Sequence, residues 1–454
     1  MDRFLTSSFG TFVMVLFQGL FTAPSWQTFV LLACGGALAS KQHTLTNYMW
    51  LTGAATLKHF SRFSVFLGCP FYHARWQVWA CIIRHAAPLI PEDPPIVVEV
   101  DDTTKKKVGR HIEGVARSRH GVGTARQEYR TLRGLNFVLG VIRVPLRRWP
   151  GHSVTVPIGL ELYLKEEQGR QYHRPYRSRS ALARAILDFV AAQLPGRPIR
   201  ALGDGGYAPK EFLRDLPETV DVVSRFLLSG TLYALPEPAA GKRRGRPPRR
   251  GKLLGAPQTL ARRRWGWAPH PTEAQAEVQS WVGLWHTVLP GRLVPLVVVR
   301  RRSAPRPKQP GQRQPLPPVE AFFTTDLSLS AEDILQQYHA RWAVEITIRD
   351  SHTFDGLGQD QCRKVPRLVG ANTFRLVMAA ARTLWFLEHT NQTHALDLRR
   401  YRPWYRHKCA PSHLDIVWAC REALHEAGVF PIPRFIPDLA ENHQEPDHAQ
   451  PSAA

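Results

Sequence analysis

Three acidic positions have the residue type and the local setting expected of a metal centre for phosphoryl transfer. One of Asp101 and Asp102 is expected at the end of a core strand, and Asp204 at the end of a shorter strand before a Gly-Gly turn. Glu345 lies in a helical stretch. Converging carboxylates repel one another unless a cation neutralises them, and ligand sets made only of oxygen favour Mg²⁺ or Mn²⁺ over zinc. Two such ions can activate water or a 3′-hydroxyl, although each acid alone is more often a cap or a turn residue.

The helical stretch around Glu345 carries a polar stripe. At about 100° per residue, one narrow arc collects the following side chains: Tyr338, Arg341, Glu345, Arg349 and His352. The neighbouring arc is expected to face the core and holds Ile334, Leu335, Trp342 and Ile346. A stripe that mixes one acid with basic and aromatic groups suits a charged ligand. The alternative is a solvated face in which Arg341 and Glu345 form an i,i+4 pair.

These residues must be positioned by a mixed α/β fold. Residues 1–92 read as helices, whose apolar runs are too short to span a bilayer. Successive strand patterns then give way to alternating helix and strand, which predicts a mixed sheet. We expect a helical DNA-binding region, a first core segment, a β-rich basic insertion, a second core segment with the Glu-bearing helix, and a C-terminal extension with a disordered tail. Their expected ranges are 1–92, 93–227, 228–320, 321–395 and 396–454.

The charge balance predicts a polyanionic partner. The chain has 454 residues with 60 Lys and Arg against 37 Asp and Glu, a formal net charge of +23. Such an excess favours nucleic acid, because neutralised phosphates release counterions. The basic stretch "KRRGRPPRRG" contains Arg244 and Arg246, in a motif slim enough for an A·T minor groove, although a solvated basic loop is an equal alternative. The six cysteines show no CxxC pair, which favours a reducing cytoplasm.

The combination of these features resembles the DDE (Asp-Asp-Glu) transposases of bacterial insertion sequences, whose catalytic core has the ribonuclease-H-like fold. Asp101-Asp102-Thr103 matches the family's Asp-x-Thr pattern, and Asp204-Gly205-Gly206-Tyr207 matches its Asp-x-Gly-Tyr pattern. Tyr338, Arg341 and Glu345 match its Tyr-x2-Arg-x3-Glu helix. The resemblance implies that Asp101, Asp204 and Glu345 hold two Mg²⁺ or Mn²⁺ ions. It also implies that Tyr338 and Arg341 contact DNA phosphate near the scissile bond.

One position departs from the family pattern, which has Lys where this chain has His352. An unperturbed His has a pKa of about 6.5, so we expect a phosphate contact there to weaken as the pH rises, with Arg341 or Arg349 as the alternative cation. The expected partners are double-stranded DNA, at terminal inverted repeats and at the target, and a second copy of the chain in the DNA complex. We expect a cytoplasmic, nucleoid-associated protein. The alternative is a decayed transposase that only binds DNA.

Overall fold

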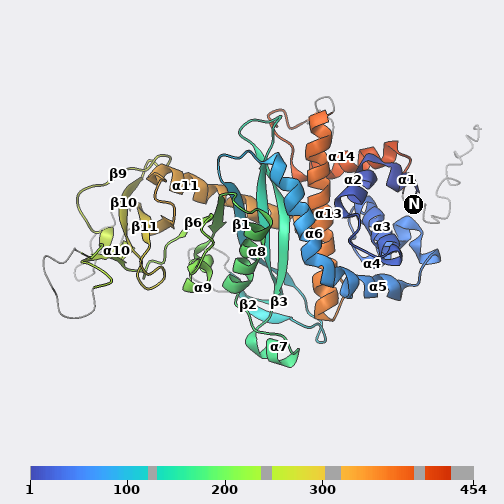
Figure 1. Cartoon of the computed structure of the whole chain (residues 1–454), viewed down its shortest axis with the longest axis horizontal. Helices are drawn as coiled ribbons and strands as arrows, with labels where there is room; N and C mark the ends of the chain where they lie inside the picture. Colours follow the sequence, from blue (N-terminus) through green and yellow to red (C-terminus); the bar gives the residue numbers. More distant parts are fainter. Residues whose placement is uncertain (1, 121–129, 237–247, 302–317, 393–403, 431–454) are drawn as a thin grey trace, which may run out of the picture.

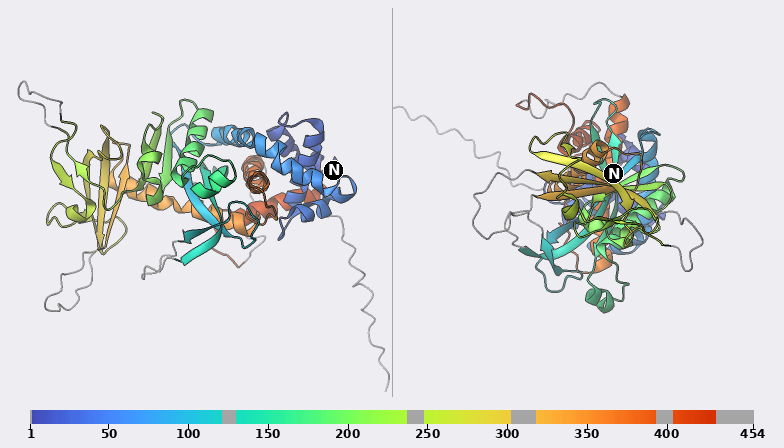
Figure 2. Two further views of the ribbon diagram at one scale, coloured as in Figure 1. Left: turned by 90° about the horizontal axis from the view of Figure 1, so that it is seen from below. Right: turned by 90° about the vertical axis from the view of Figure 1, so that its left-hand side faces the viewer.

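The computed structural model describes residues 2–120, 130–236, 248–301, 318–392 and 404–430, and shows an elongated molecule. Helices of the N-terminal region form one end, strands from the middle of the chain form the other, and the central sheet lies between them (Figures 1 and 2). The first helices are α1 Asp2–Thr6, α2 Ser8–Phe17, α3 Ala23–Leu38, α4 Leu45–Thr52, α5 Phe60–Gly68 and α6 Pro70–Ala86. The all-helical start is therefore confirmed. Within the described ranges, no helix has both the length and the apolar character needed to cross a membrane.

A mixed sheet forms the core. Its strands are β1 Ile96–Lys106, β2 Ala116–His120, β3 Arg130–Pro145, β4 Ser153–Tyr163, β5 Ile199–Gly203 and β6 Val220–Arg225. β4, β3 and β1 pair antiparallel, whereas β5 and β6 run parallel to β1. Three antiparallel strands followed by two parallel ones, with helices on both faces, give the ribonuclease-H-like core that the family resemblance implied. The helices between these strands are α7 Glu166–Gln171, α8 Arg179–Gln193 and α9 Lys210–Leu213.

The strands of the predicted insertion continue the same sheet. They are β7 Leu232–Tyr233, β8 Leu253–Gly255, β9 Ala268–Pro269, β10 Ala276–Leu284, β11 Leu293–Arg301 and β12 Val319–Thr324, with the short helix α10 Pro257–Leu260. The order β1-β5-β6-β12-β11-β10 joins core and insertion without a break. The segment is β-rich as expected. Its strands are hydrogen-bonded to the core through β6 and β12, because Phe322 of β12 pairs with Arg225 of β6.

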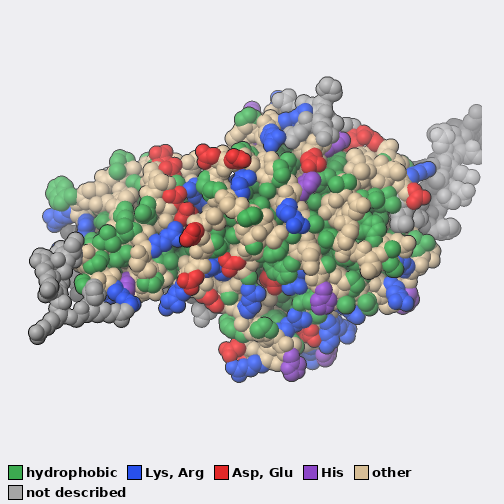
Figure 3. All heavy atoms as spheres, in the orientation of Figure 1, with side chains coloured by type: hydrophobic (Ala, Val, Ile, Leu, Met, Phe, Trp, Pro, Cys, Tyr) green, Lys and Arg blue, Asp and Glu red, His purple; other side chains and the backbone are tan. Residues whose placement is uncertain are grey.

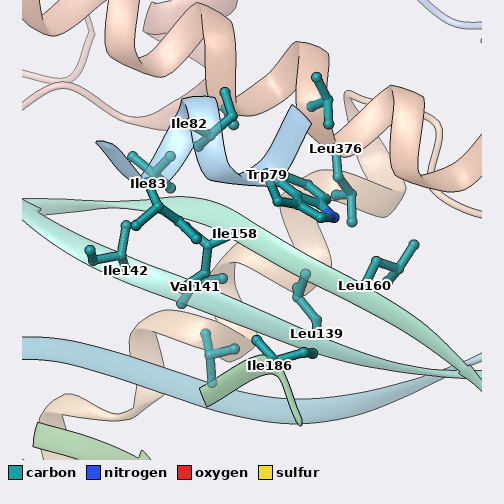
Figure 4. Close-up of a cluster of buried hydrophobic side chains, with 14 of the residues drawn as sticks. Trp79, Ile82, Ile83, Leu139, Val141, Ile142, Ile158, Leu160, Ile186 and Leu376 are labelled. Atoms are coloured by element: carbon teal, nitrogen blue, oxygen red, sulfur yellow. The ribbon is translucent and has the colours of Figure 1, made fainter. Parts of the chain in front are cut away.

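The long helix α13 (Val365–Gln392) connects the N-terminal helices with the sheet. It packs against α5 and α6 on one side and against β4 on the other, and α14 (His413–Glu426) lies beside it (Figure 1). Figure 4 shows Trp79 and Ile83 of α6 and Leu376 of α13 above strand residues such as Leu160. These large apolar side chains are buried, so the two regions share one core.

The predicted Glu-bearing helix is two helices, α11 (Ala331–Ala340) and α12 (Trp342–Thr353), which meet at Arg341. Ser330 and Asp333 form a capping box at the start of α11. The prediction of a core-facing arc is correct for Ile334 and Leu335, which are buried, and wrong beyond the junction. There Trp342 is 60% exposed and Ile346 is partly exposed, because the break at Arg341 changes the direction of the apolar face.

The surface drawn in Figure 3 has Lys and Arg side chains spread across it, with Asp and Glu among them. The net positive charge therefore does not collect into one continuous patch on this face. Arg244 and Arg246 lie outside the described residues, as does the predicted disordered tail.

Candidate active site

Asp101 and Asp204 lie on neighbouring parallel strands. β1 and β5 pair in the register Val98 to Ala201 and Glu99 to Leu202, so two residues further along, Asp101 comes opposite Asp204. Adjacent strands are about 4.8 Å apart, which brings the two carboxylates close together. Asp204 follows β5 and accepts a hydrogen bond from the backbone N–H of Gly206 at 2.8 Å, as the Gly-Gly turn suggested.

The prediction that the first acid ends its strand is wrong. β1 continues to Lys106, because β3 is long enough to pair with it along the whole segment from Val98. Asp101 therefore projects from the middle of a strand, beside the point where the shorter β5 stops. A strand-end acid and a mid-strand acid next to a shorter neighbour give the same local sequence pattern.

The helix α12 lies along β1 on the face to which Asp101 points. The backbone N–H of Val344 donates to the Glu99 carboxylate at 2.9 Å, and the ring of His352 hydrogen-bonds the Thr103 hydroxyl at 3.1 Å. From Val344 to His352 the helix rises about 12 Å, and from Glu99 to Thr103 the strand rises about 13 Å. The helix and the strand therefore run side by side between these two contacts. Glu345 therefore lies above Asp101.

Arg341 connects the first and third acids. Its guanidinium donates to the Asp101 carboxylate at 3.2 Å and to the Glu345 carboxylate at 2.7 Å. The i,i+4 pair considered in the sequence is thus present, but it is partly buried and includes Asp101 as a third group. In the described part of the chain, no three His, Cys, Asp or Glu side chains are near enough to form a ready metal cluster. The guanidinium holds the carboxylates together by charge.

Burial makes the strand acids unusually weak. Burial and the neighbouring Asp204 carboxylate raise the pKa of Asp101 to about 7, against the hydrogen bond from the Asp102 backbone and the charge of Arg341. Burial also raises the pKa of Asp204. Closely spaced buried carboxylates of this kind are stabilised by a cation, and oxygen-only donors suit Mg²⁺ or Mn²⁺. The donor chemistry therefore fits a divalent ion.

Asp102 has different partners on the opposite face of β1. Its carboxylate accepts from the Asn136 amide at 2.7 Å and from Arg179 at 3.0 Å, and the Tyr207 hydroxyl lies 3.4 Å away. With both oxygens engaged and the side chain turned from α12, Asp102 is a supporting group in this geometry. Burial and the carboxylates of Asp102, Asp101 and Asp204 raise the pKa of Tyr207 well above its ordinary value.

Tyr338 is buried on α11, where its ring packs against Phe322 at a centroid distance of 4.7 Å. The guanidinium carbons of Arg341 and Arg225 lie 5.5 Å and 5.8 Å from its ring centroid. The ring therefore separates and orients two cations beside the acids. Arg225, at the end of β6, was not identified from the sequence, because its only local signal is a basic residue at a strand end.

Arg349 and His352 differ in exposure. Arg349 is exposed and pairs with Asp350 at 2.9 Å. His352 is held by the Leu357 carbonyl at 2.9 Å in addition to Thr103. Burial lowers the pKa of His352, so the ring is neutral near pH 7. The imidazole fastens the end of α12 to β1. The phosphate contact expected at His352 concerns the DNA complex and stays a prediction.

A buried ion pair anchors the junction between the two helices. Arg143 of β3 donates to the Glu99 carboxylate and, at 2.7 Å, to the carbonyl of Ala340, while Glu99 also accepts from the Val344 N–H. Glu99 precedes Asp101 by two positions and shares its face of β1. The Glu99–Arg143 pair thus fixes the start of α12 beside Asp101. Sequence reasoning missed it, although the period-2 spacing of the two acids was a signal.

One comparison with known proteins identifies the family of the chain. The sequence pattern of the DDE superfamily endonucleases matches residues 16–282, a range that contains Asp101 and Asp204 and ends before Glu345. None of the curated proteins matches the chain significantly. The matched range covers more than half of the chain and includes the helical start, the core strands and part of the insertion. The chain belongs to the DDE superfamily endonuclease family.

Proposed function

We propose that this protein is an insertion-sequence transposase that cleaves DNA strands at the element ends and joins them to target DNA. The observation that carries the proposal is that the Arg341 guanidinium bridges Asp101 and Glu345, while Asp204 lies opposite Asp101 at the edge where β5 ends. These acids come from distant parts of the chain, and the strand acids are weakened by burial. Such an arrangement is costly for folding, which favours a catalytic role over a structural one.

In this proposal Asp101, Asp204 and Glu345 hold two Mg²⁺ or Mn²⁺ ions. The bound ions supply the activation of water or a 3′-hydroxyl and the neutralisation of the leaving oxygen. Arg341 binds the DNA phosphate next to the scissile bond, and exchanges a carboxylate partner for a phosphate oxygen when it does so. Guanidinium groups bind both anions with the same fork geometry. Tyr338 keeps Arg341 and Arg225 in place, and double-stranded DNA is the substrate.

The test is cleavage of DNA that carries the inverted repeats flanking the gene. Asp101→Asn, Asp204→Asn and Glu345→Gln should each lower the Mg²⁺-dependent rate roughly a thousandfold, the equivalent of about 4 kcal/mol, while DNA binding persists. Asp188→Asn, at an exposed position paired with Arg184, is the matched control and should cleave normally. Unchanged cleavage by the three variants would refute the assignment. A wild-type protein that binds these ends and never cuts them would favour the DNA-binding alternative.

The choice between the adjacent acids has its own test. Asp102→Asn keeps the shape of a side chain that accepts from Asn136 and Arg179, so we expect it to retain most of the cleavage rate. Loss of cleavage in Asp102→Asn together with normal cleavage in Asp101→Asn would reverse the assignment at β1.

A further inference from the structure

A second basic site lies on the side of the sheet away from α12. A cavity of about 200 Å³ is bordered by α6, β4, the start of α13 and the segment 172–178. Its polar lining consists of Tyr72, Arg75, Glu161, Arg174 and Arg177. Three guanidinium groups therefore face one carboxylate, so the lining is positively charged even when that carboxylate is ionised. None of these residues belongs to the catalytic group described above.

Two of the arginines are held by the same tyrosine. The guanidinium carbon of Arg75 lies 4.4 Å from the Tyr72 ring centroid, and that of Arg174 lies 5.8 Å from it. Arg174 also donates to the Tyr72 hydroxyl at 2.9 Å, and Arg75 donates to the Tyr72 carbonyl at 2.9 Å. Stacking and hydrogen bonds fix both planar groups in advance, which lowers the entropy lost when an anion binds.

The carboxylate of Glu161 does not satisfy these cations fully. Its contact with Arg75 is long, at 3.5 Å, and the buried Nε of Arg75 has no hydrogen-bond partner. Burial raises the pKa of Glu161 even though Arg75, Arg177 and Arg174 act in the opposite direction. The cavity thus contains preoriented donors and a weak internal counter-ion, which are the properties of a site for an external anion.

Strand pairing and an ion pair connect this cavity with the catalytic strand β1. Asp102, Val138 and Glu161 are directly opposite one another on β1, β3 and β4, so Glu161 lies two strand spacings, or about 10 Å, from Asp102 on the same face. Arg179 spans part of this interval, since it pairs with Asp102 and lies 5.4 Å from the Tyr163 ring centroid. Arg177, two residues earlier, lines the cavity. Asp102 points to the face of β1 opposite to Asp101, so a polyanion that occupies both the cavity and the catalytic acids has to pass around the edge of the sheet.

We propose that the cavity binds a backbone phosphate of the DNA whose strand is cleaved at the catalytic acids, as a second fixed point that sets the register of the substrate. The inference rests on the proposed function. A phosphodiester fits better than a base, because the lining offers guanidinium donors and no set of groups that would read a base edge.

The first test measures binding to a mixed-sequence duplex as a function of salt, with Ca²⁺ in place of Mg²⁺. Arg174→Gln should reduce the slope of log affinity against log salt by about 1 unit. The ratio of wild-type affinity to variant affinity should therefore be roughly tenfold larger at 0.1 M salt than at 1 M salt. Arg170→Gln removes the same charge from a nearby exposed pair with Glu166 and serves as control, with a smaller change expected. Equal slopes for wild type and Arg174→Gln would overturn the proposal.

The second test removes the negative charge from the cavity and should strengthen DNA binding. Glu161→Gln removes the internal counter-ion, so it should tighten DNA binding and steepen the salt dependence. A purely structural Glu161 would instead lower the melting temperature without tightening binding.

Arg75→Gln leaves a buried carboxylate without its partner and endangers folding, so it is combined with Glu161→Gln. The folded double variant should still bind DNA more weakly than Glu161→Gln alone, and equal affinity of the two would contradict the assignment.

The third test locates the phosphate. Single methylphosphonate substitutions along the element-end DNA should reveal one position at which wild type loses affinity and Arg174→Gln does not. If no such position exists, the cavity does not hold a backbone phosphate of the DNA. If inorganic phosphate raises the melting temperature of wild type but not of Arg174→Gln, and no DNA position couples to Arg174, the cavity is a free-anion site and the DNA proposal fails. Because these assays need no cleavage, their outcome is independent of the fate of the catalytic assignment.

Discussion

At the scale of single residues, Arg341 is the group on which the candidate site depends. It joins Asp101 of β1 to Glu345 of α12, and its ring neighbour Tyr338 orients it. The residue types could be predicted from the sequence, because the Tyr-x2-Arg-x3-Glu spacing and the Asp-Gly-Gly turn are local. The partners could not, since Glu99, Arg143 and Arg225 meet these residues only through the pairing of strands that are far apart in the chain.

The raised pKa of Asp101 predicts a pH-dependent stability effect. The native pKa of about 7 lies above the ordinary 3.8, so the native state binds the proton more tightly than the unfolded state does. Stability of the metal-free wild type should therefore fall as the pH rises from 4 to 7, and Asp101→Asn should be free of this loss. At pH 8 the variant should be more stable by at most about 4 kcal/mol, with the difference vanishing near pH 4.

Urea unfolding in EDTA measures this difference in stability, with Asp188→Asn as the exposed control. A variant less stable than wild type at pH 8 would show that the ionised carboxylate stabilises the fold.

The environment of His352 predicts an absence of titration. Burial lowers its pKa, and both ring nitrogens have partners, so the ring stays neutral above pH 6.5. DNA affinity of wild type and His352→Gln should therefore change in parallel between pH 6.5 and 8.5 at fixed salt, in a series of fluorescence anisotropy titrations. A loss of affinity with rising pH that occurs only in wild type would restore the phosphate-linked charge expected from the sequence.

At the scale of elements, the break between α11 and α12 decides where Glu345 points. An uninterrupted helix would keep Trp342 and Ile346 on the buried face of Leu335, and the structure exposes both. The helical period was readable in the sequence, but the break was not, because neither Gly nor Pro stands at or beside Arg341 to mark it. Arg143, which lies outside the segment, holds the junction by pairing with Glu99 and by donating to the Ala340 carbonyl.

This anchoring predicts that Glu99 acts on catalysis through position. Glu99→Gln keeps the size of the side chain but removes its charge, so it should cost about 1–3 kcal/mol of stability. It should also loosen the start of α12, raise the Mg²⁺ concentration needed for half-maximal cleavage and lower kcat more than it raises KM. Both are measured well below the melting temperature. A lower melting temperature with an unchanged Mg²⁺ requirement would mean that the pair only stabilises the fold.

At the scale of the whole molecule, one sheet and one helix connect all described parts. The sheet continues from the core into the predicted insertion, and α13 connects the sheet with the N-terminal helices. The order of elements could be predicted from hydrophobic patterns. The joining of core and insertion strands into one sheet could not be predicted, because β6 and β12, which pair with each other, are far apart in the chain. Asp350, Asp355 and Asp360 are also buried, and their local sequence gives no sign of it.

Asp355 is the point where three of these parts meet. It follows α12, pairs with Arg382 in the middle of α13, and hydrogen-bonds His413 at the start of α14 at 3.1 Å. Burial alone would raise the pKa of Asp355, but His413 and Arg382 outweigh it and hold that pKa below its usual value. Arg382 is 2% exposed, so it has no access to water as a substitute partner.

Removal of this carboxylate should therefore weaken the entire molecule. Asp355→Ala leaves the buried guanidinium of Arg382 uncompensated, which should cost about 3–5 kcal/mol in urea unfolding followed by tryptophan fluorescence. Asp355→Leu combined with Arg382→Met removes both charges and should recover most of that loss. Glu166→Ala, which breaks an exposed pair with Arg170, is the control and should cost less than about 1 kcal/mol. If the double variant is as unstable as Asp355→Ala, packing around α13 and not the buried charge explains the effect. If Asp355→Ala resembles the control, water reaches Arg382, and the pair does not join the three parts.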